Sequence, residues 1–157
     1  MSWWSTKVRQ TWRHLSGRVS DAERAELAAW LTAPQLRLFD AMHRADRRHG
    51  IDVMQALAVD GHDDRELLLA ALFHDCSKGP QVRLPHRIAW SLGERYGERV
   101  LAALGHVPTF ASAFERIRDH AGDSARMALE AGCSKRTADL IRHQAEPWDP
   151  VAGAALQ

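Results

Sequence analysis

An uninterrupted run of seven apolar residues, Leu67 to Phe73, is followed directly by the polar pair His74-Asp75. Asp63 or Asp64, just before the run, is expected to cap it, so this pattern predicts a helix that is buried on nearly every side. A buried imidazole or carboxylate is costly unless it is paired or coordinated. The sequence therefore predicts a functional site where this helix ends.

Helix signals recur along the rest of the chain, whereas the two-residue alternation typical of strands is nearly absent. Ser20 and Glu23 form a capping box, Thr32 and Gln35 repeat that pattern, and Gly132 follows a helix as a C-terminal cap. We therefore predict an all-α, single-domain helical bundle. The expected helices lie at about residues 20–31, 32–42, 45–60, 64–73, 86–96, 98–104, 110–119, 122–131 and 134–144.

Composition narrows the classes of function. The 157 residues are 45% hydrophobic and 26% charged, which is typical of a globular domain with one core. A net charge of +1 argues against general nucleic-acid binding. Two cysteines form no disulfide framework, and the sequence shows neither a signal peptide nor a transmembrane segment, so we expect a cytoplasmic protein.

The N-terminal residues 1–18 form a basic amphipathic pattern, in which Trp3, Trp4 and Trp12 are interleaved with lysine and arginine. Two interpretations stay open. The favoured one is a helix that docks on the core of the same chain, so residues 1–33 are expected to pack on the main domain. The alternative is a helix that binds a membrane surface or a partner protein.

Histidine is the commonest metal ligand, and this chain has nine. His74 and Asp75 are adjacent, so on a regular helix their side chains diverge by about 100°. Both can reach one metal only near a helix end, and the helix-stopping Gly79 lies close behind. His49 shares an apolar stripe with Val53, so it is predicted to face the interior. These residues together indicate a mononuclear site built from several helices.

The segments Asp46-Arg-Arg-His49-x-x-x-Val53 and Leu68-x-Ala-Ala-Leu-Phe-His74-Asp75-x-x-Lys78 resemble the HD-domain superfamily of metal-dependent phosphohydrolases. That family combines a histidine, a later His-Asp doublet and a distant aspartate. The stretch that begins at His120 and the segment from Leu140 to Gln144 are also similar to family segments. The resemblance covers about residues 36–157 and implies an HD domain over residues 34–157.

The resemblance implies that His49, His74 and Asp75 are metal ligands. His120 and His143 match positions that hold a second metal in some members, but Gln144 stands where a further histidine is usual. One metal or two therefore stays open. So does Asp149, which either supplies the distant aspartate or is a turn residue beside two prolines. The donor set accepts manganese, iron, zinc, magnesium, cobalt or nickel.

Phosphate chemistry also needs cations. The family motif implies that Lys78 is catalytic together with Asp75 and binds phosphate, with Arg83 and Arg87 as further phosphate-binding candidates. For the two arginines, a solvated helix face is the alternative. Cys76 is expected to be an inert buried thiol. His43 and His62 do not fit the pattern and are expected to be solvated.

The leading hypothesis is a phosphohydrolase that cleaves a phosphate mono- or diester, with a nucleotide as one candidate substrate. The alternative is a catalytically weak or inactive HD domain that senses a nucleotide or binds a partner. A third possibility, an oxidative di-iron enzyme, is disfavoured by Gln144. Self-association into a homo-oligomer stays open.

Overall fold

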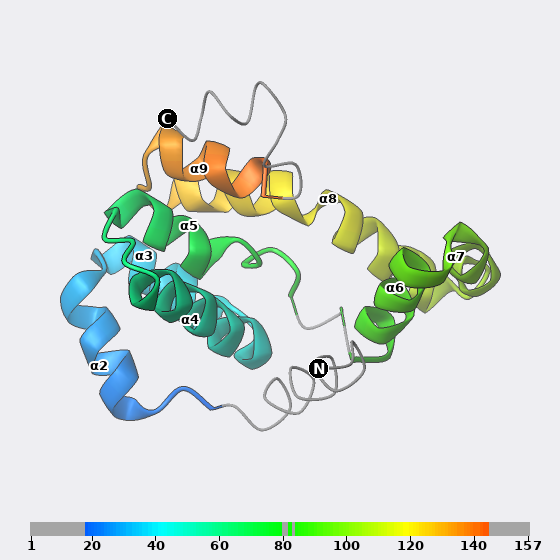
Figure 1. The fold of residues 1–157 in the computed structure, drawn as a ribbon, viewed down its shortest axis with the longest axis horizontal. Coiled ribbons are helices and arrows are strands. Elements are labelled where there is room, and N and C mark those ends of the chain that lie inside the picture. Colours follow the sequence, from blue (N-terminus) through cyan, green and yellow to red (C-terminus); the bar gives the residue numbers. More distant parts are fainter. Residues whose placement is uncertain (1–17, 80–81, 83, 145–157) are drawn as a thin grey trace.

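Helix α8 (Pro108–Glu130) joins two hydrophobic clusters in the computed structural model, which describes residues 18–79, 82 and 84–144. Eight α-helices and no strand occur within those ranges, which confirms the prediction of an all-α bundle. Figure 1 shows α6 and α7 at one end of α8, while the other helices gather around its far half. These helices are α2 (Asp21–Trp30), α3 (Ala33–Ala41), α4 (Arg44–Val59), α5 (Arg65–Phe73), α6 (Leu84–Tyr96), α7 (Glu98–Gly105) and α9 (Lys135–Arg142).

The helix boundaries follow the capping residues of the sequence. At the start of α2, the Ser20 side chain accepts a hydrogen bond from the backbone of Glu23, and the Glu23 carboxylate accepts one from the Ser20 backbone. Asp64 caps α5 by accepting from the backbone N–H groups two and three residues later. Gly132 has a φ of +82°, a conformation that suits glycine, just beyond the end of α8. These predicted caps are confirmed.

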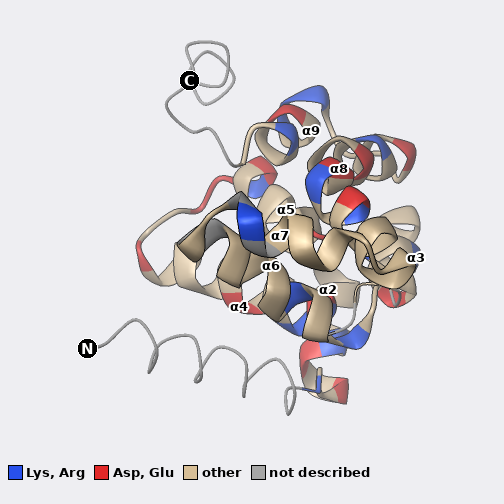
Figure 2. Cartoon of the chain, turned by 90° about the vertical axis from the view of Figure 1, so that its right-hand side faces the viewer, with Lys and Arg blue, Asp and Glu red and all other residues tan. Residues whose placement is uncertain are grey.

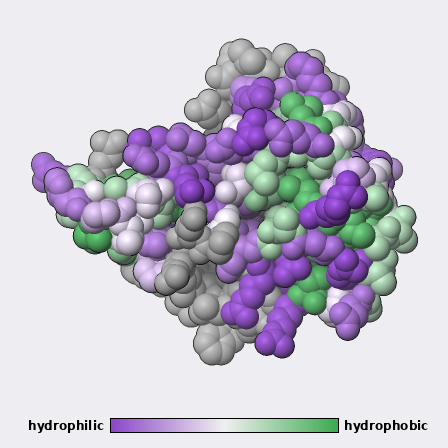
Figure 3. All heavy atoms as spheres, turned by 180° about the vertical axis from the view of Figure 1, so that it is seen from behind, coloured by the Kyte–Doolittle hydropathy of each residue, from purple (hydrophilic) through white to green (hydrophobic). Residues whose placement is uncertain are grey.

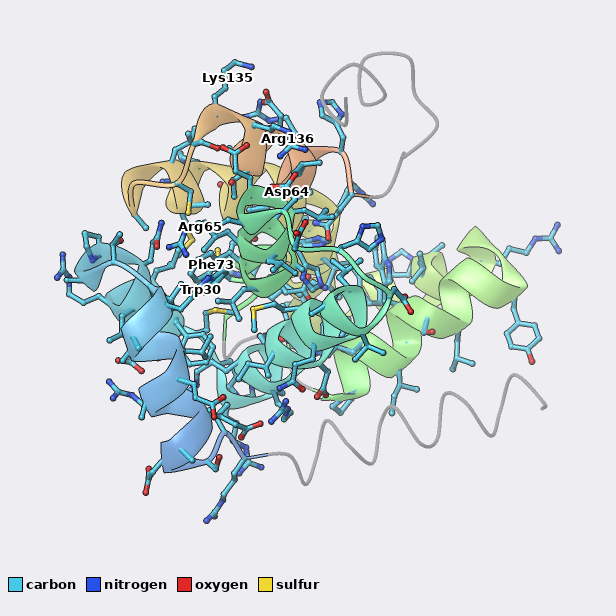
Figure 4. All side chains as sticks on the ribbon, turned by 60° about the vertical axis from the view of Figure 1, so that its left-hand side comes forward. Trp30, Asp64, Arg65, Phe73, Lys135 and Arg136 are labelled. Atoms are coloured by element: carbon cyan, nitrogen blue, oxygen red, sulfur yellow. The ribbon has the colours of Figure 1, made fainter. Side chains whose placement is uncertain are left out.

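The main core surrounds α5, which packs between α4 and α9. Leu72 and Phe73 are fully buried there, so the apolar run in the sequence is the centre of the fold. Polar contacts tie the start of α5 to its neighbours. Figure 4 shows Arg136 of α9 beside Asp64, and the two form an ion pair of 2.6 Å. Arg65 stacks on the Trp30 ring at the end of α2 (Figure 4).

A second, smaller cluster joins α6 and α7 to the first half of α8. Its buried members are Val82, Ala89, Phe114 and Ile117. The Trp90 ring packs against Phe114 with the ring centroids 5.7 Å apart. Helix α8 therefore contributes to both clusters, and α6 packs in the second one.

The prediction of two helices at residues 110–119 and 122–131 is wrong, because α8 is continuous from Pro108 to Glu130. Gly122, at the start of the second expected helix, lies on an exposed part of α8. A helical glycine costs only about 1 kcal/mol relative to alanine, so flanking packing is sufficient to carry the helix through it. His120 consequently projects from the middle of a long helix rather than from a helix start.

The surface carries charges of both signs. In Figure 2, basic and acidic residues alternate along α8 and α9. On the face shown in Figure 3, hydrophobic residues form separate patches between hydrophilic ones. Among the described residues, no helix is long and apolar enough to span a membrane. The predictions for the N-terminal residues 1–17 and for Asp149 lie outside the described residues.

Acid should destabilise the contact between α2 and α4. Arg48, through its hydrogen bond, and Ser20 together lower the pKa of Glu23 from 4.5 to about 2. The stabilisation is therefore complete above pH 4.5 and is lost as the pH falls through the folded value. We expect a loss of about 1 kcal/mol, because the ion pair is partly exposed. Urea unfolding of wild type and Glu23→Gln between pH 7 and pH 2 measures it; identical pH profiles for the two proteins would contradict this assignment.

Candidate metal centre

Three side chains meet where α5 ends. They come from α4, from the end of α5 and from the turn that follows it. Helix α5 ends at Phe73, His74 is its C-terminal cap, and Asp75 lies in the turn that follows. His49 comes from the middle of α4, and its ring lies edge-on to that of His74, with centroids 5.0 Å apart. One ligand atom from each of His49, His74 and Asp75 lies within 4.8 Å of the others, so the group could hold a metal ion. The prediction that adjacent residues converge at a helix end is confirmed.

The close approach of α4 and α5 depends on a glycine. Gly50, next to His49, is buried against α5, and a Cβ atom built on it would lie 2.4 Å from the backbone oxygen of Leu72. Only a residue without a side chain fits between the two backbones. Gly50 therefore sets the separation of the helices that carry His49 and His74.

Backbone hydrogen bonds orient two histidine rings around Asp75. His74 Nδ1 lies 2.8 Å from the carbonyl oxygen of Ala71, and His120 Nδ1 contacts the carbonyl oxygen of Ile117. A carbonyl oxygen can only accept, so each Nδ1 carries the proton and, in the neutral ring, Nε2 keeps its lone pair. Both Nε2 atoms face Asp75 Oδ1, at 3.6 Å from His74 and 3.4 Å from His120. This is the tautomer that a metal ligand needs.

Asp75 is the electrostatic centre of the site. Burial alone would raise its pKa, but Lys78, His74 and His120 together hold the pKa of this carboxyl well below its usual range. Lys78 Nζ lies 2.7 Å from Asp75 Oδ1. A buried, ionised carboxylate beside two imidazoles fits a divalent cation.

His120 contacts Asp75 and so belongs to the centre, and its imidazole ring is kept neutral. Burial lowers its pKa, and the nearby Lys78 lowers it further. Gln144 Nε2 lies 3.3 Å from both His120 Nε2 and the backbone oxygen of His74. Gln144, at the position where the sequence resemblance led us to expect a histidine, therefore contacts the centre. His143, its neighbour, follows the end of α9 and is not a member of the three-residue group.

The predicted phosphate-binding residues have different surroundings. Lys78 contacts Asp75 directly. Arg87 of α6 forms an ion pair of 2.6 Å with the buried Asp46 of α4, and its Nε donates to the carbonyl oxygen of Val82. Arg83 lies outside the described residues.

The two histidines that were set aside lie apart from the centre. His62 is exposed, as expected. His43 is half-buried, and its Nδ1 caps α4 by accepting from the backbone of Ala45.

Sequence reasoning missed three polar residues behind the centre. Asp46 precedes His49 by three residues, so it lies on the same face of α4; that spacing was the available signal. The other two residues are Ser77 and Ser124. Ser124 Oγ accepts from the Ser77 backbone at 3.1 Å, and Ser77 Oγ donates to the carbonyl oxygen of His120. No local sequence pattern predicts this contact, which holds the turn after α5 against α8.

Neither described cysteine should react with thiol reagents in the folded protein. Cys76 and Cys133 are buried, and burial raises the pKa of the Cys76 thiol to about 12. Since the thiolate is the reactive form, we expect alkylation by iodoacetamide to be at least about 100-fold slower than in denaturant. Mass spectrometry of native and denatured samples checks this. Rapid native labelling of Cys76 would show that the turn opens.

No family model, no curated protein and no solved structure matches the chain. The case for a function therefore rests on the residues and the geometry of the centre.

Proposed function

We propose that the chain is an HD-domain-type, metal-dependent phosphohydrolase that cleaves a phosphate mono- or diester. The observation that carries the proposal is the convergence of His49, His74 and Asp75 within 4.8 Å, with the Lys78 ammonium 2.7 Å from Asp75. Metal ligands and a phosphate-binding cation then occupy one site. The family resemblance of the sequence pattern supports the same assignment.

His49, His74 and Asp75 would hold the ion, and His120 stands close enough to Asp75 to assist. When bound, a divalent ion lowers the pKa of a coordinated water and polarises a phosphoryl oxygen. The mixed nitrogen and oxygen donor set accepts manganese, iron, zinc, magnesium, cobalt or nickel.

The chain's own residues supply the rest of the chemistry. Asp75 stays ionised because of its cationic neighbours, so it can accept a hydrogen bond from the attacking water and orient it. Lys78 is only partly exposed. Its ammonium has three N–H groups, and one that points at Asp75 can instead donate a hydrogen bond to a phosphate oxygen. The turn that carries both residues is fastened by Ser77 and Ser124, which limits their movement.

A panel of generic and nucleotide phosphoesters, assayed with each of the six metals, tests the proposal. We expect hydrolysis by the wild type that is lost in both His74→Ala and Asp75→Ala. Asp123→Asn, which changes an exposed carboxylate on α8, is the matched control and should keep wild-type activity. Bound metal without turnover of any ester would instead favour the nucleotide-sensing or partner-binding module.

A further inference from the structure

Gln144, which follows helix α9, reaches the metal centre with its amide nitrogen. Gln144 Nε2 lies 3.3 Å from the backbone oxygen of His74 and 3.3 Å from His120 Nε2. The His74 oxygen can only accept a hydrogen bond, so the NH₂ end of the amide, and not its oxygen, faces both partners. An NH₂ group has two donors, which is one for each partner. Gln144 therefore links the end of α9 to two of the histidines around Asp75.

The nitrogen of His120 that Gln144 contacts is the one that a metal would need. His120 Nδ1 contacts the carbonyl oxygen of Ile117, which can only accept, so Nδ1 carries the proton and Nε2 has the lone pair. The NH₂ group in front of Nε2 requires the same tautomer. One lone pair cannot accept a hydrogen bond from Gln144 and bind a metal ion at the same time. The contact with Gln144 therefore competes directly with coordination by His120.

Asp75 is near enough to both sets of imidazoles to be shared by two ions, but the two places are unequal. His49, His74 and Asp75 offer three ligand atoms within 4.8 Å of one another. His120 Nε2 lies 3.4 Å from Asp75 Oδ1, yet His120 belongs to no such group of three among the residues that the structure describes. An ion beside His120 would also face the positive end of the Gln144 amide. The first place is suited to a cation, and the second is not.

We propose that Gln144 limits the centre to a single metal ion, because its amide occupies the lone pair of His120 that a second ion would need. This inference rests on the metal centre of the proposed function. His120 then contacts the carboxylate of Asp75 without binding metal itself. A single ion held by three protein side chains keeps a coordination position open for water or substrate, as catalytic zinc sites do.

The first test counts the ions in the wild type. Elemental analysis after loading with excess manganese and removal of free metal should give one ion per chain. Electron paramagnetic resonance should show the resolved hyperfine lines of an isolated Mn²⁺ ion, because two ions that share a carboxylate couple magnetically and lose them. Two coupled ions overturn the inference and leave the phosphohydrolase proposal standing. One ion without hydrolysis of any ester supports the inference and overturns the phosphohydrolase, and no bound ion overturns both.

The second test replaces the donor by a ligand. Gln144→Glu keeps the length of the side chain, removes its N–H groups and brings a carboxylate next to His120 Nε2. That carboxylate, His120 and Asp75 would then form a second set of three ligands, so this variant should bind two magnetically coupled manganese ions per chain. If the variant is folded by circular dichroism and still binds one ion, Gln144 does not set the number of ions. The wild-type count stands as a test even if the variant does not fold.

Two controls locate the second ion. Gln55→Glu makes the same substitution at an exposed position of α4, so it should keep one ion per chain. Gln144→Glu/His120→Ala removes the imidazole that should bind the second ion, so it should return to one ion per chain. Two ions in the Gln55→Glu variant, or in the double variant, would contradict a specific role for the contact between Gln144 and His120.

Discussion

The Asp75→Asn variant should lose metal affinity by at least about 100-fold, because even residues that only support metal ligands contribute 10- to 100-fold. Asp75 is the only carboxylate in the described three-residue group, and its ionised state is maintained by Lys78, His74 and His120. An amide keeps the shape of the side chain but offers no charge to a cation. Titration with manganese or cobalt, followed by calorimetry, measures the loss, and phosphoester hydrolysis should fall with it.

The single variant leaves Lys78 beside a neutral amide, so a loss of binding could arise from partial unfolding. The double variant Asp75→Asn/Lys78→Met separates the two causes, because replacing both partners of a buried pair is often close to neutral for stability. It should unfold at about the same urea concentration as the wild type and still fail to bind metal. Recovery of metal binding in either variant would remove Asp75 from the ligand set.

Gly50→Ala should destabilise the fold by about 2 kcal/mol, although alanine is the better helix former by about 1 kcal/mol. The added methyl group would lie 2.4 Å from the Leu72 oxygen and 3.2 Å from its carbon, and both are backbone atoms. Neither can rotate away, so α4 and α5 must separate. We expect the melting temperature to fall by about 4 to 8 °C. Metal affinity should fall as well, because His49 moves away from His74.

Gly122→Ala is the matched control. Gly122 also lies within a helix, but a Cβ atom there meets nothing within 4 Å. The same substitution should therefore stabilise the protein by about 0.5 to 1 kcal/mol and leave metal binding unchanged. Thermal melting of both variants checks the pair. If Gly50→Ala melted at or above the wild-type temperature, the close approach of the two helices would not depend on glycine.

Local signals were sufficient to predict most of the helices. Ser20, Asp64 and Gly132 cap helices where the sequence indicated, because a cap depends on residues within one turn of it. The continuity of α8 through Gly122 could not be predicted from such local signals. Whether a helix continues through a glycine depends on packing along its whole length, and α8 is held by both hydrophobic clusters.

The centre was predictable only in part. The residues His49, His74 and Asp75 could be selected from their types and from the hydrophobic pattern around them, and the structure brings them together. The long-range contacts around them could not be predicted. Gln144 reaches His120 and His74 from 70 residues beyond His74, and Arg87 reaches Asp46 from another helix. Such pairs depend on how the helices pack against one another, and the local patterns of a single sequence do not predict that packing.

Metal content measured by elemental analysis shows whether His49, His74 and Asp75 form a metal centre. Wild type and His49→Ala are loaded with manganese or zinc, dialysed together and analysed alongside the exposed-site control His62→Ala. We expect at least one ion per chain in the wild type and in His62→Ala, and a near absence of metal in His49→Ala. Equal metal content in all three proteins, or no metal in any of them, would contradict it.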